Sequence, residues 1–164
     1  MVKARRITMP TQDQPYSGRF EGPRHLFSVR VYYEDTDLSG IVYHANYLRW
    51  FERARSDMLR LIGIDQRAAL EAGDGAYAVA DLFIRYLAPA RLDDAVTIES
   101  TLIELGAASV RLNQRASRAQ TLLAEAQIRV GFVSPEGRPR RQPQAWREAF
   151  RAALTPAKPE IPAA

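Results

Sequence analysis

The stretch "FSVRVYYEDTDLSGIVYHANYLRWFERARSDMLRLIG", residues 27–63, changes its hydrophobic period midway and thereby decides the fold. Up to Asp35, apolar and polar residues alternate, which predicts a half-buried strand. After Gly40 the period becomes helical, and one apolar arc contains Tyr47, Leu48, Phe51, Ala54, Met58, Leu59 and Ile62. The opposite face carries Arg49, Arg53, Asp57 and Arg60. This pattern predicts an amphipathic helix that packs on a sheet and ends at Gly63.

Beyond this helix the chain reads as a short helix and then a series of strands. The short helix covers residues 65–72, before Gly73 and Gly75. The strand-like segments are 76–87, 95–105, 108–118 and 122–134, and a last amphipathic helix covers 144–154. One strand, one long helix and four successive strands predict an α+β domain with a largely antiparallel sheet and a helix across it.

Composition limits the possible classes of protein. A chain of 164 residues with 46% hydrophobic residues fits a single domain with a real core. The absence of cysteine excludes disulfides, a thiolate nucleophile and a cysteine-based metal site. No apolar run reaches the roughly 20 residues that cross a bilayer, and the first residues lack the apolar segment of a signal peptide. We therefore expect a cytoplasmic protein without a transmembrane segment.

The net charge of +4 is concentrated at the two ends of the chain. Residues 1–24 and 136–164 each carry a net charge of +3, which leaves −2 for the middle. We expect a flexible basic extension at 1–24, a domain at 25–152 and a flexible tail at 153–164. A solubilising role for these ends is favoured over nucleic-acid binding.

Few side chains remain as candidates for chemistry. The chain has no Gly-x-Ser-x-Gly elbow and no glycine-rich phosphate loop, and its two histidines, His25 and His44, lie too far apart for a zinc motif. We therefore expect neither a metal nor a cofactor. Two carboxylates, Asp35 and Asp37, stand just before the long helix, with Gly40 between them and the helix start.

This placement suits acyl transfer. The first N–H groups of a helix lack partners within the helix and carry its positive dipole end, so they can hold an oxyanion. A carboxylate beside them can attack a bound carbonyl or activate water. Gly40 allows the backbone to reverse between the two groups. The simpler alternative is that Asp37 caps a turn and Asp35 ends a strand.

Several neighbouring side chains also have a structural interpretation. Glu52 and Arg55 have the spacing of a salt bridge, with Arg55 toward the apolar arc. His44 is either packed at the helix start or part of the site. Tyr43 and Tyr47 suit a core or a pocket wall better than proton donation. His25 is expected to be exposed before the first strand.

Two stretches together carry a family resemblance: "VRVYYEDTDLSGIVYHANYLRWFERARSDMLR", 29–60, and "RYLAPARLDDAVTIES", 85–100. They resemble the hotdog-fold acyl-CoA thioesterases of the 4-hydroxybenzoyl-CoA thioesterase type, and among these the YbgC group associated with the Tol-Pal envelope system. The resemblance implies a five-stranded antiparallel sheet wrapped around one long helix. It also implies a homodimer with active sites at the interface, often assembled as a dimer of dimers.

The resemblance also implies an activity and its residues. The protein would hydrolyse acyl-CoA without a cofactor, since coenzyme A belongs to the substrate. The catalytic carboxylate falls on Asp37, as nucleophile or general base, and the oxyanion donor is the backbone N–H of His44. Substrate-binding positions would be Gly40, Tyr43, Tyr47 and Phe51, with Arg85 and Arg91 for the phosphates of coenzyme A and Arg111 and Arg115 behind them.

Two other functions stay open at this stage. A hotdog hydratase acting on enoyl or hydroxyacyl thioesters would use a histidine and an acid, here His44 and Asp37. A scaffold that binds acyl carrier protein or envelope-assembly partners would use the basic ends, because they would attract an acidic carrier.

Overall fold

A computed structural model describes residues 13–155 of the chain. In chain order, its elements are β1 (Arg19–Glu21), β2 (Arg24–Arg30), a 3₁₀ turn (Tyr33–Asp35), α1 (Asn46–Leu61), α2 (Gln66–Glu71), β3 (Ala76–Tyr86), β4 (Ala95–Leu105), β5 (Ser109–Arg118), β6 (Thr121–Val133) and α3 (Gln144–Leu154). No helix within residues 13–155 is long and apolar enough to cross a membrane.

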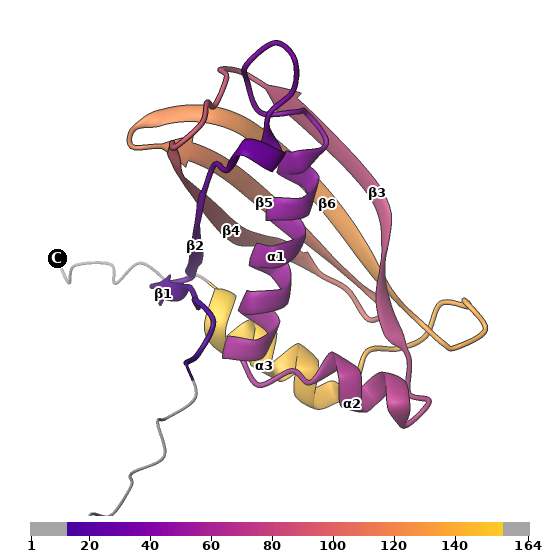
Figure 1. The fold of residues 1–164 in the computed structure, drawn as a ribbon. Coiled ribbons are helices and arrows are strands. Elements are labelled where there is room, and N and C mark those ends of the chain that lie inside the picture. The colour runs from indigo at the N-terminus through magenta and orange to yellow at the C-terminus, as the bar shows by residue number, and fades with distance from the viewer. Residues whose placement is uncertain (1–12, 156–164) are drawn as a thin grey trace, which may run out of the picture.

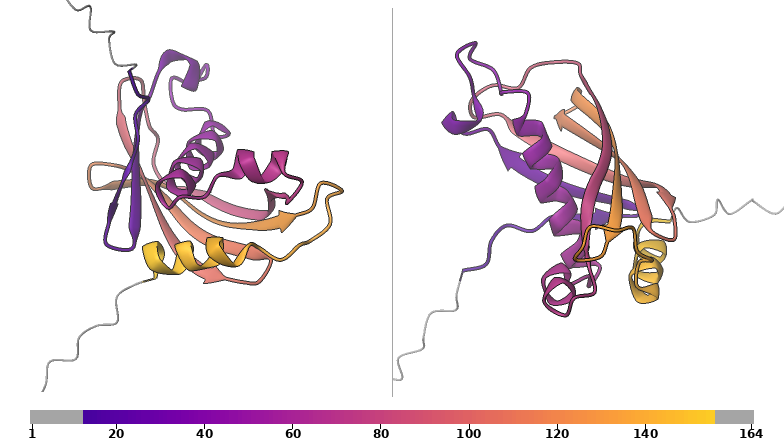
Figure 2. Two further views of the ribbon diagram at one scale, coloured as in Figure 1. Left: turned by 90° about the horizontal axis from the view of Figure 1, so that it is seen from below. Right: turned by 90° about the vertical axis from the view of Figure 1, so that its right-hand side faces the viewer.

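The six strands form one antiparallel sheet in the order β1-β2-β4-β5-β6-β3. The sheet curves around α1, which crosses it between β2 and β3 (Figure 1). The segment that contains α1 therefore connects β2, next to one edge of the sheet, with β3 at the opposite edge. Helices α2 and α3 lie at the end of the molecule opposite the loop that precedes α1 (Figure 2).

The core lies between α1 and the inner face of the sheet. Strand β6 shows the period of two clearly, because Ala124, Ala126 and Ile128 are buried while Gln127 between them is exposed. Helix α1 contributes fully buried side chains from Trp50, Phe51, Ala54 and Met58. Phe150 and Leu154 of α3 complete this cluster. The predicted α+β architecture with one long helix is therefore confirmed, although Leu48 of the predicted apolar arc is exposed.

The sheet has six strands rather than the predicted five. Residues 19–21, within the predicted N-terminal extension, form β1 and pair with β2 as a hairpin. Strand β2 ends at Arg30, and Tyr33–Asp35 form a 3₁₀ turn instead of continuing the strand. Residues 1–12 of the predicted extension and 156–164 of the predicted tail lie outside the described residues.

The prediction that His25 is exposed was wrong. Its side chain is fully buried, and Nε2 lies 2.7 Å from Oδ2 of Asp57, a residue that the helical period had placed on the polar face of α1. The N-terminal segment covers this side of the helix, because the Ser17 hydroxyl and the Gly18 N–H each donate to Asp57 at 2.9 Å. Burial lowers the pKa of His25, and the bond to Asp57 opposes this shift.

Candidate active site

Asp35 fixes the loop between β2 and α1. One oxygen of its buried carboxylate accepts from the Tyr32 N–H at 2.7 Å, and the other accepts from Nδ2 of Asn46 at 2.8 Å. Its backbone carbonyl accepts from the Tyr43 N–H at 2.9 Å. Asp35 thus ties the end of the sheet to the start of α1, and both carboxylate oxygens are already engaged.

Asp37 has the opposite environment, exposed on a tight turn. Gly40 closes the turn by donating its N–H to the Asp37 carbonyl at 3.0 Å, and it has a φ of 77°, which favours glycine. Oδ1 of Asp37 accepts from the Ser39 hydroxyl and, at 2.8 Å, from the Ser39 N–H. Within the described residues, Oδ2 has no hydrogen-bond donor. One carboxylate oxygen is therefore held and the other has no partner among the described residues.

The charge on Asp37 is stabilised by its neighbours. The Ser39 hydroxyl contributes most to holding the pKa of Asp37 below its usual range, followed by the Ser39 N–H. The His44 side chain adds a smaller electrostatic effect in the same direction. Asp37 is consequently a carboxylate at neutral pH.

The start of α1 presents an unpaired donor at this place. Asn46 donates its N–H to the Tyr43 carbonyl at 2.9 Å, and no side chain caps the helix at Ala45. In the described part of the chain, the His44 N–H has no hydrogen-bond acceptor. This free N–H lies at the positive end of the α1 dipole, where a developing oxyanion is stabilised.

An apolar hollow of about 470 Å³ lies beside His44. Its walls come from the loop before α1, from α1, from the end of β3 and from the chain that follows it. The lining residues are Ile41, Val42, His44, Tyr47, Tyr86, Leu87, Ala88 and Pro89. The Tyr86 hydroxyl donates to the His44 carbonyl at 2.8 Å. Of the predicted substrate-binding residues, Tyr47 lines the hollow, while Tyr43 lies against the His44 ring at a centroid distance of 4.5 Å. Phe51 is fully buried in the core and does not line the hollow.

The predicted arginines lie at different places. Arg85 lies opposite Glu125 on β6, on the outer face of the sheet, and its guanidinium is 3.9 Å from that carboxylate. Arg115 lies equally close to Glu125, and Arg111 is 3.8 Å from Glu104. Only Arg91 among these four lies on the loop next to the hollow.

That loop is attached to the site directly. The Val42 N–H donates to the Ala90 carbonyl at 2.9 Å, and the Arg91 N–H donates to Asp94 at 2.9 Å. The second of these bonds is the main cause of the lowered pKa of Asp94. Arg91 therefore extends from a loop whose backbone is held against the site.

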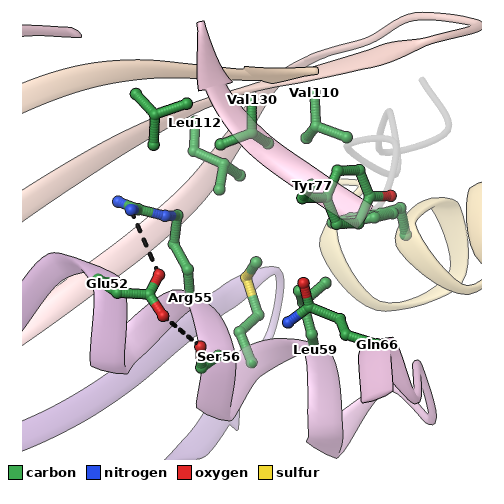
Figure 3. A pocket seen from close by; sticks show the side chains of 12 residues that line it. Glu52, Arg55, Ser56, Leu59, Gln66, Tyr77, Val110, Leu112 and Val130 are labelled. Carbon is green, nitrogen blue, oxygen red and sulfur yellow. Dashed lines mark hydrogen bonds and ion pairs between the residues drawn. The ribbon is translucent and has the colours of Figure 1, made fainter. Parts of the chain in front are cut away.

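A second cavity, of about 190 Å³, lies further along α1 between the helix and the sheet (Figure 3). Glu52 bridges Arg55 and Ser56 there, and the predicted pair is present, with 3.4 Å between Arg55 and Glu52. Arg55 is buried and donates to Gln114 at 2.8 Å, which in turn donates to Ser100 at 2.8 Å. Through this network, the buried Arg55 side chain connects α1 to the sheet, which gives it a structural role. The cavity shares no lining residue with the hollow.

Two residues of the site were not predicted from the sequence. Ser39 has the spacing of an Asp-x-Ser turn, in which the acid accepts from the residue two positions later, and that signal was available. Tyr86 comes from β3, some 40 residues after His44, and no local pattern indicates its contact. Within residues 13–155, no three His, Asp or Glu side chains gather as metal ligands would.

These features together define an α+β protein with an antiparallel sheet curved around one helix and an exposed carboxylate on the turn before the helix start. The model of the thioesterase-like superfamily matches residues 31–162. The chain is 44% identical to the acyl-CoA thioester hydrolase YbgC of Escherichia coli, over 71% of this chain and 88% of the relative. It is 43% identical to the acyl-CoA thioesterase YbgC of Haemophilus influenzae, over 65% of this chain and 79% of the relative.

A solved structure agrees with this assignment. A probable thioesterase from Bartonella henselae superimposes with a TM-score of 0.70 at 35% identity, covering 73% of this chain and 99% of the other. The chain therefore belongs to the thioesterase-like superfamily. The resemblance carried by residues 29–60 and 85–100 is confirmed, and the hydratase and scaffold alternatives are not favoured.

Proposed function

We propose that the protein is an acyl-CoA thioesterase that hydrolyses the thioester to a free acid and coenzyme A. The observation that carries this proposal is that two groups without partners, one on the turn before α1 and one at the helix start, have the chemistry that thioester hydrolysis needs. Oδ2 of the Asp37 carboxylate and the His44 N–H both lack partners among the described residues. The names of the YbgC relatives, an acyl-CoA thioesterase and an acyl-CoA thioester hydrolase, support the same reaction.

The proposed chemistry begins with the thioester carbonyl oxygen accepting a hydrogen bond from the His44 N–H. In one route, Asp37 removes a proton from water while the water oxygen bonds to the carbonyl carbon. The tetrahedral intermediate then loses the sulfur of coenzyme A, and the proton passes from Asp37 to that sulfur. In the other route, Asp37 itself bonds to the carbonyl carbon, the thiolate leaves, and water hydrolyses the mixed anhydride. Solvent oxygen found in Asp37 after one turnover would identify the covalent route.

The substrate is placed by the surroundings of these two groups. The hollow beside His44 is almost wholly apolar, which suits the acyl group or the pantetheine arm. Of the four predicted arginines, Arg91 is the best placed for the phosphates of coenzyme A, because its loop borders the hollow. Arg85 is a weaker candidate, since Glu125 already lies 3.9 Å from it.

We also propose that the active form is a homodimer joined along β3. This strand is one edge of the sheet, and Val79 and Phe83 on it are 53% and 66% exposed. An exposed apolar edge strand pairs readily with another strand. A second copy on this edge would bring its own residues close to Tyr86 and the hollow.

We further propose that the protein acts beside the Tol-Pal envelope system, as the resemblance to the YbgC group implies. We also propose that it is located in the cytoplasm. Copurification of the native protein with Tol-Pal components, together with cell fractionation, would test both.

The replacement Asp37→Asn tests the reaction. It keeps the size of the side chain and removes its charge and basicity, so kcat should fall by about 10³-fold, within the range of general-base contributions. The thermal unfolding midpoint should stay unchanged because Asp37 is exposed. Glu71→Gln, which removes an exposed carboxylate paired with Arg67 on α2, is the matched control and should keep full activity. Turnover retained by Asp37→Asn would reject the assignment.

A further inference from the structure

We propose that Tyr86 is a positioning residue for the reaction, and that its hydroxyl, by bonding to the His44 carbonyl, restrains the His44 backbone and with it the direction of the N–H that would bind the thioester oxygen. The inference rests on the proposed function and deepens it. The hydroxyl donates to the His44 carbonyl at 2.8 Å, from the last residue of β3 to the residue before the N-cap of α1.

Three N–H groups near His44 donate to backbone carbonyls of the same segment. The Tyr43 N–H donates to the Asp35 carbonyl, the Asn46 N–H to the Tyr43 carbonyl and the Leu48 N–H to the Ala45 carbonyl, at 2.9, 2.9 and 3.1 Å. Within the described residues, the His44 carbonyl has only the Tyr86 hydroxyl as a partner. The residue that offers the free N–H is therefore fixed on its carbonyl side by a single side-chain bond.

Tyr86 is itself well placed to act as a fixed point. Its backbone pairs with Ala124 of β6, and the next residue, Leu87, donates its N–H to the Leu123 carbonyl at 2.8 Å. Its ring packs edge-on against Tyr47 at 5.5 Å and against His44 at 6.2 Å. Burial raises the pKa of the Tyr86 hydroxyl, which keeps it protonated as a donor.

Such a bond matters because oxyanion donors act only when they are aimed correctly. A donor displaced by about 1 Å can cost up to 10²-fold in rate, because the stabilisation depends on preorganised geometry. Through Tyr86, the hydrogen-bonded sheet restrains His44, a loop residue that belongs to no helix or strand. A shift of the edge strand β3 would therefore also move the His44 backbone.

The replacement Tyr86→Phe removes the hydroxyl and keeps the ring. We expect kcat to fall by about tenfold or more while KM stays within about twofold, since the lost contribution appears in the transition state. The factor should be equal for a short and a long acyl-CoA, because both share the same carbonyl. Hydrogen exchange of the amides of residues 44–46 should become faster.

The matched control is Tyr77→Phe, on the same strand, which removes a hydroxyl bonded to Gln142 at the other end of β3. It should leave kcat unchanged.

An unchanged kcat and unchanged amide exchange in Tyr86→Phe would overturn the inference. A change in KM that depends on the acyl group would also overturn it, because Tyr86 would then be only a pocket wall. Asp37→Asn is assayed in parallel. If wild-type protein does not cleave acyl-CoA, the proposed function fails, whereas an active wild type with an unaffected Tyr86→Phe rejects the positioning role alone.

Discussion

Asp35 and Asp37 are separated by a single residue, yet their surroundings assign them different roles. Asp35 is buried and its carboxylate accepts from Tyr32 and Asn46, so it stabilises the loop. Asp37 is exposed and uses only Oδ1, with Ser39 as the donor. The sequence places both acids before a helix, but the 3₁₀ turn at Tyr33–Asp35 decides which carboxylate faces inward.

The hydroxyl of Ser39 gives Asp37 a testable pH dependence. It stabilises the charged form, so the pKa of Asp37 lies below the usual value, and the carboxylate stays charged to a lower pH than an ordinary aspartate. In the proposed mechanism, activity is lost as the pH falls through this pKa. In Ser39→Ala the pKa of Asp37 should rise, and the acidic limb of the kcat/KM profile should shift to higher pH. The N–H of residue 39 remains, so part of the effect persists.

The pH profile of Ser39→Ala should be compared with that of Ser28→Ala. Ser28 lies on β2, away from the site, and its hydroxyl contacts that of Thr97 on β4. An acidic limb that stays in place in Ser39→Ala would show that Asp37 is not the group whose ionisation controls the rate.

At the scale of elements, regular segments could be predicted well. Helix α3 has the predicted bounds, and α1 ends before Gly63, which has the positive φ of 81° expected of a helix stop. Strands β3 to β6 also fall where alternation and turn residues placed them. In each case the hydrophobic period predicted the type of element, and a nearby glycine, a proline or the two adjacent aspartates at 93 and 94 predicted where it begins or ends.

Contacts between distant segments could not be predicted in this way. Strand β1 has only three residues, too few for a periodic signal. The burial of His25 and Asp57 depends on Ser17 and Gly18, about 40 residues before Asp57. The same holds for the site, because Tyr86 approaches His44 only after β3 has paired with β6.

The N-terminal segment makes Gly18 a sensitive position. A Cβ atom there would lie 2.3 Å from the Leu26 carbonyl oxygen and 2.8 Å from Oδ2 of Asp57. The first of these atoms is backbone, so the segment would have to move and would weaken the Gly18 N–H bond to Asp57. Gly18→Ala should therefore lower the free energy of unfolding by about 1–3 kcal/mol.

Urea unfolding would measure this change. Gly131→Ala in β6 is the control, since a Cβ there meets only the Ala108 carbonyl at 4.0 Å, and it should be neutral or slightly stabilising. If Gly18→Ala were as stable as wild type, the segment would not pack on α1 as described.

At the scale of the whole molecule, the two edges of the sheet differ. Strand β1 has three residues and carries Arg19 and Glu21, which is a short and charged edge. Strand β3 has eleven residues and exposes the large apolar side chains of Val79, Leu82, Phe83 and Tyr86. Edge strands of the first kind resist pairing and those of the second kind invite it. One edge therefore suits the proposed pairing with a second copy, and its last residue, Tyr86, lines the hollow beside His44.

This asymmetry predicts that charge on β3 breaks the dimer. The double replacement Val79→Lys and Phe83→Lys places two cations on the edge strand that a second copy would pair with. Light scattering after gel filtration should show a dimer for wild type and a monomer for the variant. The kcat/KM for acyl-CoA should fall in parallel, because the proposed site needs the second copy. Leu70→Lys on α2, which replaces another exposed apolar residue, should stay dimeric and active. A wild-type monomer with full activity would contradict the interface, and a charged variant that remains dimeric would place the contact on another surface.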